Sequence, residues 1–212
     1  MFSAFFKMRS FIQRLVRSWW PVFLFLLFPT SAQAHSDLRL GPFAGGILHP
    51  LETPAHLLLL ISLGLFLGQH PLLSLKSPLV IFGFTTAVAL LLAAVINLSG
   101  IPQVPLFCLS LGLGALISSG FKPPGWIYLL LLVLPAVGIG LDSGFGSLPM
   151  IVACEVLFAT WVCLLVMVGY IAFYVSLLPA RQWSRIGVRI LGSWIVAISV
   201  LILAFFLKNG KI

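Results

Sequence analysis

The chain has 212 residues, of which 61% are hydrophobic and 8% are charged, and its formal net charge is +8. A soluble domain carries roughly a quarter charged residues, and a small globule cannot hide this much apolar surface from water. The composition excludes a soluble globular protein and predicts an all-α, polytopic transmembrane helix bundle in a lipid bilayer. The basic residues lie between apolar runs and form no stripe, so we expect no nucleic-acid partner.

The first segment has the features of a secretory signal peptide. Residues 1–18 carry four basic side chains and no acid, and an apolar stretch follows from Trp19 to Pro29. Ala32-Gln33-Ala34 then matches an A-x-A cleavage site. We predict a cleaved signal peptide over 1–34, with His35 as the new N-terminus. An uncleaved anchor helix is the alternative, and it leaves the remaining topology unchanged.

Six apolar runs separated by short turn-rich breaks follow the cleavage site. Each is near the ~20 residues needed to span a bilayer, so residues 35–212 are predicted to form one six-helix transmembrane domain. The helices are expected at about 43–69, 78–98, 103–119, 125–141, 149–178 and 186–207.

The charges of the connecting loops predict the orientation. Lys and Arg occur in the loops at 70–77, 120–125 and 179–189 and are absent from those at 97–102 and 142–148. The positive-inside rule then predicts a bacterial inner-membrane protein with a periplasmic mature N-terminus. Lys208 and Lys211 would be external, against this pattern.

The first predicted span holds the densest group of ionisable residues. Such residues are costly inside a membrane, which makes them functional candidates. His49, Glu52 and His56 are spaced i, i+3, i+7, so in a continuous helix they share one face. The two histidines would then lie about 10.5 Å apart along the axis, too far to share one ion.

Two prolines argue against a continuous helix here. Pro50 and Pro54 predict a break at 49–53, and Thr53 followed by Pro54 is typical of an N-cap and a first helical residue. The break could bring His49 and Glu52 toward His56. Imidazole nitrogens with a carboxylate oxygen suit a first-row divalent metal. Alternatively, the histidines lie at the outer interface and satisfy loop carbonyl groups.

Further candidates lie outside this cluster. His35 and Asp37 could add external metal ligands, and Glu155 should lie well inside the fifth span and face the bundle interior, protonated or ion-paired. We interpret Asp142 as a loop residue at an external helix end and His70 as solvated. No enzyme motif is found, neither GxSxG, HExxH nor GxxxxGK[ST], so we expect no enzyme activity.

The sequence resembles the HupE/UreJ family of hydrogenase and urease accessory membrane proteins. The match begins with the signal peptide ending before a histidine and continues through residues 41–50, which read GPFAGGILHP. His56 and the apolar run 57–64 follow. His49, Pro50 and His56 fall on the family's H-P and final H at the correct spacing, and the length and six-span count also fit.

The chain also departs from the family pattern. The aspartate expected before the second histidine is Ala55, and Glu52 could partly replace its carboxylate. A later family stretch with two histidines is present here as Val137 to Asp142, without histidine. The resemblance implies a permease or a metal-delivery accessory protein for nickel or cobalt.

We therefore expect a permease for a divalent transition metal, nickel first, with no tightly bound cofactor. His49, His56 and Glu52 would bind the ion after its capture by His35 and Asp37, and Glu155 would be the second acid along its path. A membrane potential or ion gradient would drive the transport. Alternatively, the chain is a non-transporting membrane scaffold or accessory subunit of a metalloenzyme or larger transporter complex. A metalloenzyme maturation partner or a homo-oligomer would then be expected. An intramembrane enzyme is a third class.

Overall fold

The computed structural model describes most of the chain after the predicted signal peptide. The described residues are 41–69, 76–96, 103–144, 148–179 and 181–209. The chain divides into two units, Met1–Ser36 and Asp37–Ile212, and all described residues belong to the second. The predicted signal peptide over 1–34, His35, Asp37 and His70 lie outside the described residues, so their roles stay predictions.

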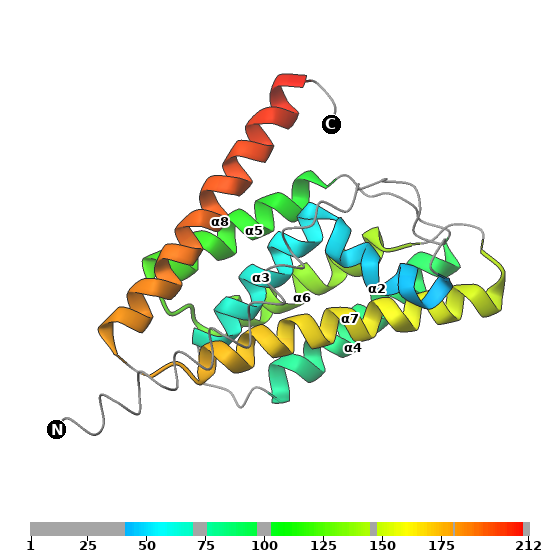
Figure 1. Cartoon of the computed structure of the whole chain (residues 1–212), viewed down its shortest axis with the longest axis horizontal. Coiled ribbons are helices and arrows are strands. Elements are labelled where there is room, and N and C mark those ends of the chain that lie inside the picture. Colours follow the sequence, from blue (N-terminus) through cyan, green and yellow to red (C-terminus); the bar gives the residue numbers. More distant parts are fainter. Residues whose placement is uncertain (1–40, 70–75, 97–102, 145–147, 180, 210–212) are drawn as a thin grey trace, which may run out of the picture. The chain divides into compact units, whose positions relative to one another are not determined.

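The described part is built from helices alone, with no strand in the described ranges (Figure 1). This confirms the predicted all-α helix bundle. The observed bounds follow the apolar runs of the sequence closely. The helices are α2 (Pro42–Glu52), α3 (Pro54–Gln69), α4 (Lys76–Val95), α5 (Val104–Ser119), α6 (Gly125–Asp142), α7 (Met150–Ser176) and α8 (Gln182–Asn209).

The helices account for most of the predicted spans. Helices α4, α6, α7 and α8 are long and apolar enough to cross a membrane, and the bent pair α2–α3 makes a fifth if it counts as one span. Helix α5 fills the place of the third predicted span. Its 16 residues correspond to about 24 Å, somewhat short of a hydrocarbon core of about 30 Å.

Two close helix contacts run in parallel along α7. Gly64 and Gly68 of α3 lie against residues 168–171 and 172–175 of α7. Helix α2 lies against the N-terminal half of the same helix through Gly46. Helix α3 therefore runs in the direction of α7, as expected in an alternating topology when three spans, α4, α5 and α6, lie between them.

Helices α5 and α8 are antiparallel, as expected when two spans, α6 and α7, lie between them. Gly114 of α5 lies 3.0 Å from Gly192 of α8, counted from an added Cβ, whereas Ser118 of α5 accepts a hydrogen bond from Arg189. Residue numbers that rise along α5 therefore face residue numbers that fall along α8, so the two helices are antiparallel. These directions agree with the alternating topology that the loop charges predict.

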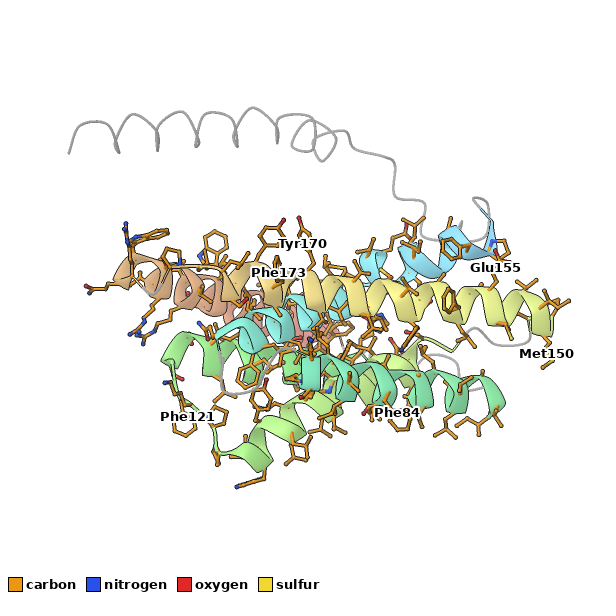
Figure 2. The ribbon with its side chains drawn as sticks, turned by 90° about the horizontal axis from the view of Figure 1, so that it is seen from below. Phe84, Phe121, Met150, Glu155, Tyr170 and Phe173 are labelled. Carbon is orange, nitrogen blue, oxygen red and sulfur yellow. The ribbon has the colours of Figure 1, made fainter. Side chains whose placement is uncertain are left out.

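Helix α3 forms the centre of the bundle. It packs against α5, α6, α7 and α8, and Leu59, Leu63 and Phe66 are fully buried. The peripheral helices expose many large apolar side chains, such as Phe84 and Phe173 (Figure 2). A surface of this kind is stable in contact with lipid hydrocarbon, and contiguous apolar exposure is otherwise rare in soluble monomers.

Basic side chains gather at one end of the bundle. Lys76 begins α4, Lys122 lies between α5 and α6, and Arg181, Arg185 and Arg189 lie at the start of α8. All five are exposed. We call this the basic end.

The described acids lie toward the opposite end, which we call the acidic end. Glu52 ends α2, Asp142 ends α6, and Glu155 lies in the second turn of α7. Figure 2 shows Glu155 and Met150 at this end and Phe121 at the basic end. Lys208, in the last turn of α8, is the one described cation that departs from the separation.

Candidate functional site

The predicted break in the first span is present between α2 and α3. Thr53 separates the two helices with extended backbone angles, φ −85° and ψ 108°, and their axes differ by 74°. Pro54 cannot donate a backbone hydrogen bond, and it disfavours the helical conformation of the residue before it. The break at Thr53 lies within the predicted range 49–53, and Pro54 starts α3 as predicted, whereas Pro50 lies inside α2 and does not end it.

Thr53 stabilises the break in a way that differs from the expected N-cap. Its backbone N–H and its Oγ1 hydroxyl both donate to the carbonyl of His49, at 3.1 and 2.9 Å. The side chain therefore satisfies a terminal carbonyl of α2 and does not accept from the first turn of α3. The carbonyl of Thr53 accepts from Leu57, which begins the hydrogen bonding of α3.

A threonine on α7 compensates for the proline inside α2. In a regular helix the carbonyl of Gly46 would accept from residue 50, but Pro50 has no N–H. The hydroxyl of Thr160 donates to this carbonyl instead, at 2.9 Å. Thr160 is fully buried, so this bond joins α2 to α7 inside the bundle. It supplies a donor to a backbone carbonyl that would be costly to leave unpaired within a membrane.

Gly46 allows α2 to approach α7 closely enough for this bond. A Cβ atom at Gly46 would lie 2.4 Å from the carbonyl oxygen of Val156 and 2.9 Å from the Cβ of Ala159. Any side chain would force the helices apart. The position of α2, and of His49 in its last turn, therefore depends on a glycine.

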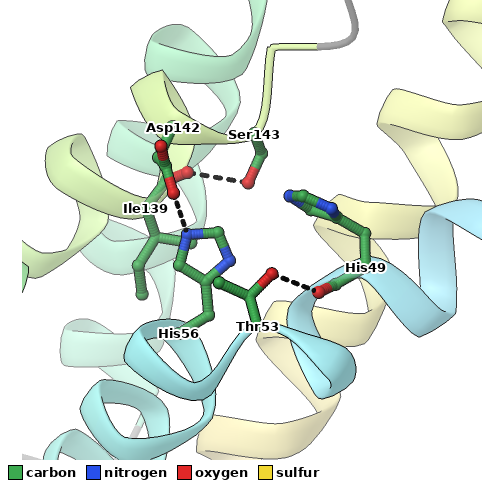
Figure 3. A network of polar contacts seen from close by, with 6 residues as sticks. All are labelled: His49, Thr53, His56, Ile139, Asp142 and Ser143. Carbon is green, nitrogen blue, oxygen red and sulfur yellow. Dashed lines mark hydrogen bonds and ion pairs between the residues drawn. The ribbon is translucent and has the colours of Figure 1, made fainter. Parts of the chain in front are cut away.

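The main polar contact of the site joins α3 to α6. Nε2 of His56 lies 2.9 Å from Oδ2 of Asp142, a contact between residues 86 positions apart (Figure 3). His56 is fully buried and Asp142 is 9% exposed. The alternative in which His56 satisfies a loop carbonyl is not observed, because its described partner is a carboxylate.

The interpretation of Asp142 as a loop residue is wrong. It is the last residue of α6, where the partial negative charge of the helix end disfavours a carboxylate. Hydrogen bonding to His56 offsets that repulsion and the cost of burial. Ser143 completes the turn, since its backbone N–H and hydroxyl both donate to the carbonyl of Ile139, at 3.0 and 2.7 Å.

The second nitrogen of the His56 ring is available within the described part of the chain. Nδ1 is buried and has no hydrogen-bond partner among the described residues. An ionised Asp142 only accepts hydrogen bonds, so it favours the tautomer with the proton on Nε2 and the lone pair on Nδ1. Figure 3 shows Nδ1 on the side of the ring that faces His49.

The break brings the two histidines together. The ring centroids of His49 and His56 lie 5.4 Å apart, with an angle of 74° between the ring planes. A coordinating nitrogen lies about 2.0–2.1 Å from the metal, so two imidazoles sharing one tetrahedral ion have centroids roughly 5 Å apart. The pair therefore has a spacing compatible with a shared ion, which a continuous helix would not provide.

The site has few protein ligands for a metal ion. Across the described ranges, no group of three or more His, Cys, Asp and Glu side chains is arranged to hold one. Asp142 supports His56 from behind, in the way that carboxylates orient metal-binding histidines. Any bound ion would complete its coordination with water or backbone oxygen.

The remaining predicted acids lie outside the His56–Asp142 pair. Glu52 is exposed in the last turn of α2, and the carboxylate bonded to His56 belongs to Asp142. The prediction that Glu155 faces the bundle interior is wrong, because it is exposed on α7 (Figure 2). The 27 residues of α7 correspond to about 40 Å, so its first turns can extend beyond a hydrocarbon core of about 30 Å.

Two residues of the candidate site, Asp142 and Thr160, were not assigned to it from the sequence. Asp142 is one of only four acidic residues in the chain. Its place at the end of an apolar run was a signal that could have marked it as a candidate. Thr160 is a polar residue within the apolar run of α7, and Pro50 predicts a carbonyl in need of a donor. Neither pattern identifies the partner, because each contact joins distant parts of the chain.

Comparisons with protein-family models, with curated proteins and with solved structures gave no match for this chain.

Proposed function

We propose that this chain is an integral membrane permease for a divalent transition metal ion, with nickel as the first candidate. The observation that carries the proposal is the His56–Asp142 pair, in which Nε2 is bonded to a carboxylate and Nδ1 is left buried on the side of His49. A histidine held by a carboxylate through one nitrogen is the usual arrangement of a metal ligand. The resemblance to the HupE/UreJ family supports the choice of nickel.

In the proposed mechanism the ion binds at the break between α2 and α3. His49 and His56 would supply two imidazole nitrogens, and the negative charge of Asp142 would favour a cation beside them. The exposed Glu52, three residues after His49, would attract cations to the break. Water would fill the remaining positions, and the small number of fixed ligands would let the ion leave again.

The break between α2 and α3 favours a role in transport of the ion over a role in holding it permanently. Interrupted helices in transporters place backbone groups and side chains at a site within the membrane. Here the two histidines belong to different helices. His49 lies on α2, which is hydrogen-bonded to α7, and His56 lies on α3 and is bonded to Asp142 of α6. Movement of one helix relative to the other would separate the ligands and release the ion.

One observation favours the second candidate, a non-transporting accessory subunit. The described residues offer no group of three or more ligands, and a protein that only positions a partner would need none. In that case substitution of the histidines would have little effect on metal uptake, and a metalloenzyme or transporter subunit would copurify.

Uptake of radiolabelled nickel by cells tests the proposal. We expect wild-type cells to accumulate nickel and cells with the double variant His49→Ala/His56→Ala to lose that uptake. Ser62→Ala is the matched control, because Ser62 is a buried residue of α3 whose hydroxyl bonds to the nearby carbonyl of Leu59. Equal uptake by the wild type and the double variant, at equal expression, would refute this site.

A further inference from the structure

The basic end contains two arginines whose side chains make no polar contact with the described part of the bundle. Arg181 and Arg185 are exposed and lie one helical turn apart at the start of α8. Their guanidinium groups form no hydrogen bond or ion pair with any of the described residues. Arg189, one turn further, is different, because its Nε and a terminal nitrogen donate to the carbonyls of Ser118 and Ser119 at 2.6 and 3.2 Å.

The position of these arginines matches the surface of a bilayer. Helix α8 continues from them and is long and apolar enough to cross a membrane. Trp183, between the two arginines in sequence, is 60% exposed, and exposed tryptophans are typical of the membrane–water interface. Arg181 and Arg185 therefore lie where lipid headgroups surround the helix.

The positive charge of the basic end favours an anionic partner. The described acids Glu52, Asp142 and Glu155 lie away from it, so no described carboxylate competes for the guanidinium groups. A guanidinium group presents a planar pair of donors that matches phosphate oxygens. Basic side chains next to a membrane span are attracted to anionic lipids.

From this arrangement we propose that Arg181 and Arg185 bind the phosphate of an anionic phospholipid at the start of α8. Arg181 directly precedes α8, and its carbonyl accepts the hydrogen bond of the Arg185 N–H at 3.3 Å, so the two arginines lie at the two ends of one backbone turn. The exposed apolar surface of α8 would accommodate the acyl chains, which a soluble anion lacks. The inference does not depend on metal transport.

Native mass spectrometry of the purified full chain tests the proposal. The wild type is mixed with phosphatidylglycerol or phosphatidylcholine, and bound lipid is counted at increasing lipid concentration. We expect the wild type to prefer phosphatidylglycerol. The variant Arg181→Gln/Arg185→Gln should bind it roughly 25-fold more weakly, because each arginine is expected to contribute about a factor of five to the affinity.

The variant Lys208→Gln is the matched control, because Lys208 is an exposed cation at the other end of the same helix. It should bind phosphatidylglycerol as the wild type does. Equal binding of the two lipids by the wild type, or equal loss in both variants, would overturn the proposal. Salt added to the wild type gives a test that needs no variant, since binding that ignores salt would also contradict it.

Discussion

At the acidic end a helix breaks beside a buried histidine that is bonded to a buried carboxylate, whereas at the basic end the charged side chains are exposed around unbroken helices. The polar groups of the break are fixed by other helices, His56 by α6 and the Gly46 carbonyl by α7. At the basic end only Arg189 among the described cations bonds to a neighbouring helix. A buried polar group must be matched by a specific partner, but an exposed charge needs only water or headgroups.

The difference separates two uses of polar residues in a membrane helix. Those of the basic end can orient the chain without a fixed geometry, so sequence position is enough to place them. Those of the break require contacts between distant segments. Substitutions at the break should therefore change activity and stability, and equivalent changes at exposed positions should not.

The largest expected effect concerns Asp142, compared with the exposed acid Glu155. Asp142→Asn keeps the size of the side chain but removes the charge that orients His56, so nickel uptake should fall about 10–100-fold, as for other carboxylates behind metal-binding histidines. Glu155→Gln should transport at the wild-type rate. Initial uptake rates at equal expression measure both. Equal rates for the two variants would show that Asp142 has no special role in uptake.

A smaller effect is expected at Gly46, compared with Gly112. An alanine at Gly46 would collide with Val156 and Ala159, whereas a Cβ at Gly112 meets nothing within 4 Å. Overpacking of this kind destabilises by about 1–3 kcal/mol. The midpoint of thermal unfolding in detergent should therefore fall for Gly46→Ala and stay unchanged for Gly112→Ala. A wild-type midpoint for both would show that α2 is not held closely on α7.

The smallest effect sharpens the role of Thr160. Thr160→Val keeps the shape of the side chain but leaves the Gly46 carbonyl without its donor, which should cost about 1 kcal/mol for a hydrogen bond between membrane helices. Thr160→Ser retains the hydroxyl and should remain closer to the wild type. The unfolding midpoints of the two variants decide the point, and a serine variant no better than valine would assign the loss to packing.

The helices and the break could be predicted from the sequence because each depends on local chemistry. Apolar runs of the required length predict the helices, and Pro54 predicts the break at Thr53. Pro135 shows the limit of this reasoning, since it lies inside α6 without ending the helix. Pro50 likewise lies inside α2, where Thr160 supplies the missing donor, and the chain leaves the helix only at Thr53, directly before Pro54.

The partner of His56 and the environment of Glu155 depend on tertiary structure. Asp142 reaches His56 only because α6 ends level with the first turn of α3. Glu155 is exposed because the neighbouring Val156 faces Gly46 of α2. The side of α7 that faces the bundle is set by where a glycine permits contact, and hydrophobicity along an almost wholly apolar helix does not reveal it.

In the proposed mechanism His49 and His56 share one divalent ion at the break. X-ray absorption spectroscopy at the nickel edge, on purified protein loaded with one equivalent of nickel, tests it most directly. We expect a coordination shell with two imidazole rings in the wild type, and loss of stoichiometric binding in His56→Ala. A shell without imidazole, or binding that persists unchanged in that variant, would contradict it.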